Sequence, residues 1–184
     1  MSNQDDQITP DYLVQSIKIR TDEVFSTMLG LEIAAIEPQA GIDETREQGS
    51  GLVSLIGLAG SWSGTGSISC SEHFACRMAS SLLMSPYETL NEDVLDAMGE
   101  ITNMIIGNVK TCLEERIGPM GLSTPTVIFG RDFQTRSARV HNWTVVPFRS
   151  GDEKLFVQMC LAPTREPEKG STRQAFQIPH VLTV

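Results

Sequence analysis

The sequence predicts an α+β domain in which one largely antiparallel sheet of about six strands is layered with helices, as an α/β sandwich. Strand-like runs occur in groups before and after a block of helical segments, instead of alternating with single helices. The 184 residues suffice for one domain with a substantial core, and no internal repeat or domain linker is visible. We therefore expect one domain over 10–162, between tails at 1–9 and 163–184.

The first predicted element is a helix that begins at Pro10 and ends at Gly30. Its apolar residues fall near helical spacing, proline is well suited to a first helical turn, and glycine is a common stop. A short strand over 31–37 follows. Residues 38–51 are rich in Gly, Pro and charge, which is typical of a loop.

Two β-type runs, LVSLIGLAG and WSGTGSISC, meet near Gly60 and Ser61 and predict a hairpin. Ser71 is suited to N-cap the helix that comes next, EHFACRMASSLLM. This helix should end before Pro86, because the residue preceding a proline disfavours helical geometry.

The longest helix is predicted over about 90–117. Thr89 with Glu92 three residues later matches a capping box, and Gly118 followed by Pro119 indicates the end. Three strand-like runs then complete the domain, at 124–130, 138–148 and 154–162.

Composition excludes several classes of function. The formal net charge is −9, and no basic stripe is visible that could replace counterions on nucleic acid or attract an anionic membrane. No apolar run reaches the roughly 20 residues of a spanning helix, and the N-terminus lacks the pattern of a signal peptide. The four cysteines lie in apolar or periodic segments, so we expect reduced core residues of a cytoplasmic protein.

The long helix has two distinct sides at about 3.6 residues per turn. Four residues spaced by four, three and four positions form a line opposite the apolar stripe: Asp96, Glu100, Asn103 and Gly107. The stripe that should face the core consists of Val94, Leu95, Met98, Ile101, Ile105, Val109, Cys112 and Leu113.

This polar line admits two interpretations. It could be a solvated face, as most polar stripes are. However, Gly costs about 1 kcal/mol and Asn roughly 0.6 kcal/mol relative to Ala inside a helix. Gly lets another backbone approach closely, and Asn offers a donor and an acceptor without charge. The choice of Asn103 and Gly107 therefore favours a docking and chemical edge.

The sequence DAMGEITNMIIGN…STPTVIFG resembles the CheC/CheX/FliY family of chemotaxis phosphatases. That family carries Asp or Ser, then Glu four residues later, Asn three residues after that, and a Pro some twenty-two residues further on. Asp96, Glu100, Asn103 and Pro125 match this pattern, and the order of elements agrees more loosely over 10–162. The first helix has Glu23 but Ser26 where a second Asn would fall, so a single motif remains, as in CheX.

The resemblance implies a phosphatase that hydrolyses the aspartyl phosphate of a CheY-like response regulator. Glu100 would pair with the receiver's active-site lysine, and Asn103 would orient a water in line with phosphorus. Mg²⁺ would belong to the receiver, so we expect neither a cofactor nor metal ligands on this chain. A homodimer is also implied.

Four further residues receive expected roles. Asp96 would support Glu100 or contact the partner. Met104, beside the line, and Gly107, at its end, are expected to contact the receiver. Pro125 should shape the loop beside the helix.

Two other functions stay open: a non-catalytic adaptor that binds a receiver or motility component through the same helix edge, and a structural dimer whose edge is merely exposed. A metal site is not expected at Cys70, His73 and Cys76, because a structural zinc usually takes four ligands and no fourth is evident.

Overall fold

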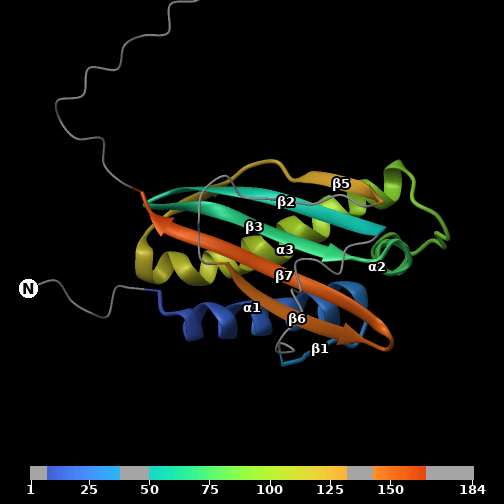
Figure 1. Cartoon of the computed structure of the whole chain (residues 1–184), viewed down its shortest axis with the longest axis horizontal. Coiled ribbons are helices and arrows are strands. Elements are labelled where there is room, and N and C mark those ends of the chain that lie inside the picture. Colours follow the sequence, from blue (N-terminus) through green and yellow to red (C-terminus); the bar gives the residue numbers. More distant parts are fainter. Residues whose placement is uncertain (1–7, 38–49, 132–142, 165–184) are drawn as a thin grey trace, which may run out of the picture.

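The computed structural model describes residues 8–37, 50–131 and 143–164. In this part of the chain, three α-helices pack on one face of a single seven-stranded sheet (Figure 1). The helices are α1 (Pro10–Val24), α2 (Glu72–Leu83) and α3 (Glu92–Ile117). The strands are β1 (Ala34–Ala35), β2 (Ser50–Gly60), β3 (Trp62–Cys70), β4 (Met120–Leu122), β5 (Thr126–Arg131), β6 (Thr144–Ser150) and β7 (Glu153–Pro163).

All strand pairs in the sheet are antiparallel, which confirms the predicted fold class. The strand order is β1-β6-β7-β3-β2-β4, and β5 pairs with β2 on the same side as β4 does. β4 pairs with the last residues of β2, from Leu58 to Gly60, whereas β5 pairs with its first residues, from Ser50 to Leu55. β4 and β5 therefore form one interrupted edge along β2.

The first helix begins and ends largely as predicted. Thr9 caps it by accepting a hydrogen bond from the Tyr12 amide at 3.2 Å, and Pro10 occupies the first turn. The helix continues through a π-helical turn, Phe25–Leu29, which the sequence did not predict. Gly30 then stops it with a φ of 62°, a left-handed conformation that glycine adopts at little cost.

The predicted cap of α3 is wrong. Asn91, and not Thr89, is the N-cap, because its side chain accepts a hydrogen bond from the Val94 amide at 2.9 Å. The helix starts at Glu92, which leaves Thr89 too far upstream to reach these amides. The predictions for α2 and for the end of α3 are confirmed: Ser71 caps α2, and Gly118 follows the last residue of α3.

Some strands are shorter than predicted. β1 includes only two residues of the expected 31–37, and the three-residue β4 was not predicted. The predicted start of a strand at 138 lies outside the described residues, as do residues 38–49 of the expected loop over 38–51 and nearly all of the two expected tails. The last two residues of that expected loop belong to β2, which starts at Ser50.

α3 is the centre of the core. Figure 1 shows it behind the middle of the sheet, and it packs against α1, α2 and strands β2 to β5. Ile101, Ile105 and Val109 are completely buried. The predicted stripe is confirmed except at Leu95 and Cys112, which are only half-buried.

The four cysteines are free, and Cys70, Cys76 and Cys160 are buried. Burial raises the pKa of the Cys70 thiol far above its usual value, so this thiol stays protonated and unreactive. Within the described ranges, no helix is long and apolar enough to cross a membrane.

Candidate functional site

The three polar residues of the family motif lie on α3. Asp96 and Glu100 are exposed, and Asn103 is half-buried. Among the residues that the structure describes, none of these three side chains makes a hydrogen bond or an ion pair. Both groups with expected chemical roles, the Glu100 carboxylate and the Asn103 amide, are therefore available to another molecule.

Pro125 lies beside this part of α3. A Cβ built on Gly99 would lie 3.8 Å from the Pro125 Cβ and 3.9 Å from a methyl carbon of Val127. Gly99 directly precedes Glu100, so Pro125 packs against the turn that carries the carboxylate. This placement is consistent with the predicted role of Pro125 in shaping the neighbouring loop.

The two expected flanking contacts have different surroundings. Met104 is half-buried and packs against the hydrophobic core, so only part of its side chain could meet a partner. Gly107 is half-buried beside β4, where an added Cβ would lie 3.5 Å from Leu122 Cδ1. Their predicted roles as receiver contacts stay predictions.

The end of α3 is fastened to β4 by a cluster that the sequence analysis missed. Lys110 and Glu114 form an ion pair at 2.7 Å, one turn apart. The Glu114 carboxylate accepts a hydrogen bond from the Met120 amide at 2.7 Å, and the Lys110 ammonium donates to the Met120 carbonyl at 3.1 Å. The hydrogen bond from Lys110, followed by the one from Met120, lowers the pKa of Glu114. The spacing of Lys110 and Glu114 predicts their pairing, but the contact with Met120 depends on the fold.

The corresponding positions on α1 are occupied differently. Glu23 pairs with Arg20 at 2.7 Å, and the Ser26 hydroxyl donates to the Glu23 carbonyl oxygen at 3.2 Å. Here the carboxylate is already paired and no amide is present. The structure thus supports the interpretation that the chain carries one motif.

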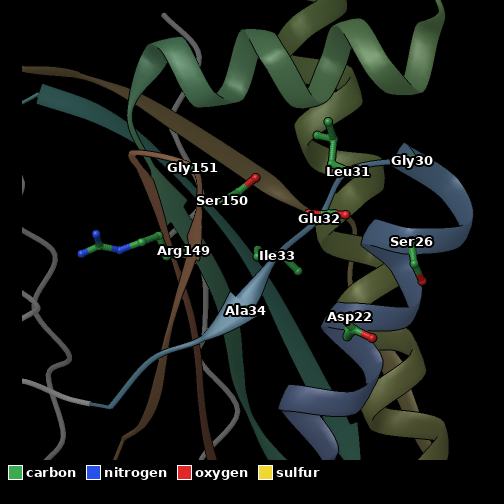
Figure 2. A pocket seen from close by; sticks show the side chains of 10 residues that line it. All are labelled: Asp22, Ser26, Gly30, Leu31, Glu32, Ile33, Ala34, Arg149, Ser150 and Gly151. Carbon is green, nitrogen blue, oxygen red and sulfur yellow. The ribbon is translucent and has the colours of Figure 1, made fainter.

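A cleft of about 580 Å³ opens beside the end of α1, and none of its lining residues belongs to α3 (Figure 2). It is lined by Asp22, Ser26, Gly30, Leu31, Glu32, Ile33, Ala34, Arg149, Ser150 and Gly151. This cleft is therefore separate from the motif, and we place the candidate site on the open edge of α3.

The Cys70, His73 and Cys76 cluster spans the junction between β3 and α2, as expected. His73 is exposed and its Nδ1 lies 2.6 Å from a Glu153 carboxylate oxygen. Across the described residues, no group of three or more potential ligands is arranged to hold a metal ion.

An open helix edge with an unpaired carboxylate and amide is suited to a macromolecular partner, since a small ligand is usually enclosed on most sides. The fold and the motif together define a protein of the chemotaxis phosphatase class. The family described as "Chemotaxis phosphatase CheX" matches residues 52–149, more than half of the chain. The chain belongs to this family, which confirms the resemblance inferred from the motif.

Known proteins agree with this assignment. The chain is 32% identical over 110 residues to the CheY-P phosphatase CheX of Thermotoga maritima, covering 58% of this chain and 71% of that protein. The crystal structure of the chemotaxis protein CheX from Vibrio vulnificus superposes with a TM-score of 0.71 at 27% identity, covering 85% of this chain and all of the other.

A third likeness concerns the fold alone. The CheX in the CheX-CheY-BeF3-Mg²⁺ complex from Borrelia burgdorferi is 22% identical and superposes with a TM-score of 0.67, covering 81% of this chain and 97% of the other. These likenesses confirm the expected fold and phosphatase class.

Proposed function

We propose that this protein hydrolyses the aspartyl phosphate of a CheY-like response regulator through Glu100 and Asn103. The main support is the unpaired Glu100 carboxylate and Asn103 amide on one side of a rigid helix. Further support comes from the Thermotoga maritima relative, which is named a CheY-P phosphatase. The Borrelia burgdorferi CheX of the same fold was solved with CheY.

The reaction needs little chemistry from the phosphatase itself. A water oxygen forms a bond to phosphorus while the bond between phosphorus and the receiver's aspartyl oxygen breaks. The products are the receiver carboxylate and inorganic phosphate. Phosphoryl transfer is accelerated mainly by positioning and by electrostatics. The Asn103 amide can donate to and accept from one water, so it can orient that water without a covalent intermediate on this chain.

Glu100 has a separate role in the proposal. Its exposed carboxylate pairs with the cationic lysine of the receiver site and holds the complex in register. Asp96 lies one turn earlier and adds negative charge toward the same partner. Mg²⁺ is expected on the receiver, whose phosphoryl group it contacts. The protein would act in the cytoplasm, and the expected homodimer can be measured by light scattering.

Steady-state dephosphorylation of phosphorylated receivers from the same organism tests the proposal. Asn103→Ala should lower kcat by about 100-fold with little change in KM, because a positioning group acts in the transition state. Glu100→Ala should mainly raise KM, by about tenfold or more, because a charge-assisted contact is lost.

Asn108→Ala is the matched control. Asn108 is an exposed amide on the same helix but lies outside the polar line, so its removal should leave both constants unchanged. Equal activity of the Asn103 and Asn108 variants would remove Asn103 from the mechanism. Receiver binding without any acceleration by the wild type would instead support an adaptor.

A further inference from the structure

The interrupted edge of the sheet is closed by one side chain. Gly57 lies on β2 between the residues that pair with β5 and those that pair with β4. The Ser123 amide donates to the Gly57 carbonyl at 2.9 Å, and the Ser123 hydroxyl accepts from the Gly57 amide at 2.8 Å. In a regular antiparallel ladder, a backbone carbonyl would take that amide. The Ser123 hydroxyl thus takes the place of a backbone carbonyl of the neighbouring strand. The backbone between β4 and β5 can therefore bend out of the regular strand pairing with β2.

We call residues 123–125 the edge kink. Inside it, the Ser123 hydroxyl also donates to the Thr124 carbonyl at 3.0 Å, so that hydroxyl is used both as donor and as acceptor. Ser123 and Thr124 are exposed, and Pro125 is half-buried. An exposed segment is therefore held in one conformation by hydrogen bonds, with little help from burial.

The edge kink passes the motif on α3. The segment starts after Leu122, which lies against Gly107, and ends at Pro125, which lies against Gly99. Asn103 stands midway between these two glycines, four residues from each. The kink therefore runs antiparallel to α3 past the turn that carries Asn103. Asn103 is half-buried, whereas Asp96 and Glu100 are exposed.

We propose that the edge kink is the second flank of the receiver site, and that Ser123 is a positioning residue for Asn103. This inference rests on the function proposed above. An asparagine on an open helix face can adopt several rotamers, whereas a catalytic water must be held to within about 0.5 Å. A fixed segment beside Asn103 limits those rotamers, and Thr124 meets the bound receiver.

Steady-state kinetics of Ser123→Ala provide the test. This variant should lose roughly tenfold in kcat with KM within about twofold, because the site binds but positions poorly. Ser123→Thr keeps the hydroxyl and should restore kcat. The matched control is Thr164→Ala: the exposed Thr164 hydroxyl donates to the Gly60 carbonyl on the same strand at 2.7 Å. Thr164→Ala should cause a similar shift in Tm but no loss of kcat.

Hydrogen exchange of the wild type separates this proposal from the proposed function. The probe is a receiver with Mg²⁺ and beryllofluoride, which stands in for the phosphoryl group, and it should protect both residues 120–127 and the motif turns of α3. Equal kcat values for Ser123→Ala and Thr164→Ala, together with an inactive Asn103→Ala, would refute the positioning role of the edge kink. The proposed phosphatase activity would still stand. Protection of both segments without any hydrolysis would support the edge kink as part of the receiver site and refute the proposed phosphatase activity. Protection of α3 alone would show that the edge kink is not part of the receiver site.

Discussion

Gly107 is a residue whose neighbours within the protein do not explain its identity. Among the residues that the structure describes, an added Cβ would come within 4 Å of Leu122 alone, at 3.5 Å, which is ordinary van der Waals contact. Glycine inside a helix costs about 1 kcal/mol relative to alanine. Packing within the protein therefore does not explain why this position carries a glycine that lowers helix stability. Close contact with another molecule would explain it, because such a contact requires a position without a side chain.

Gly107→Ala should raise the free energy of unfolding by about 1 kcal/mol and weaken receiver binding. Gly66→Ala, on β3, is the control, because its Cβ would lie 2.7 Å from Cγ2 of the buried Ile106 on α3. This variant should lower the free energy of unfolding by about 1–3 kcal/mol. Urea unfolding and titration with a receiver measure both effects. Unchanged receiver affinity in Gly107→Ala would exclude Gly107 as a contact.

The start of α2 is joined to the turn between β6 and β7 by polar side chains. The Ser71 hydroxyl caps the helix and also donates to a Glu153 carboxylate oxygen at 2.7 Å. His73 lies 2.6 Å from the other oxygen, and Arg77 adds positive charge nearby. Burial acts to raise the pKa of Glu153, but the hydrogen bonds from Ser71 and His73 outweigh it and leave the pKa below its usual value.

This junction predicts a pH-dependent stability. A carboxyl whose folded pKa is depressed stabilises the fold above its unfolded pKa of about 4.3 and loses that contribution as the pH falls through the folded value. Glu153→Gln should therefore lower the free energy of unfolding at pH 7 by roughly 1 kcal/mol, since the pair lies near the surface. In chemical unfolding at successively lower pH, the difference from the wild type should shrink as the pH falls through the folded pKa of Glu153. A difference that stays constant with pH would indicate a packing effect.

Local signals in the sequence predicted most of the helices and strands. The apolar period of α3, the hairpin at Gly60 and Ser61, and the Ser71 cap are confirmed. The cap of α3 was misassigned because Thr89 and Asn91 are both good capping residues, and only the helix start decides between them. β4 was missed because three residues give no recognisable alternation.

For the molecule as a whole, how well the sequence predicted a feature depended on how far apart its residues lie along the chain. Helical spacing placed Asp96, Glu100 and Asn103 in one line without any knowledge of the fold. The edge kink could not be found in this way, because Ser123 and Gly57 are 66 residues apart and their pairing depends on the register of the sheet. Pro125 was singled out by resemblance to a family, and its contact beside Gly99 became visible only in the structure.

The sheet edge also bears on how the protein loses activity under stress. α3 is anchored by a buried core, whereas the edge kink is exposed and held mainly by hydrogen bonds. Exposed segments with few buried contacts open at lower free energy than the core. In a urea titration, the dephosphorylation activity should therefore be lost at a lower urea concentration than the helical circular dichroism signal. Equal urea midpoints for the two signals would show that the edge kink and the core unfold together. A preparation that looks folded by its helix content could then already be inactive, and dilution of the urea would restore it without global refolding.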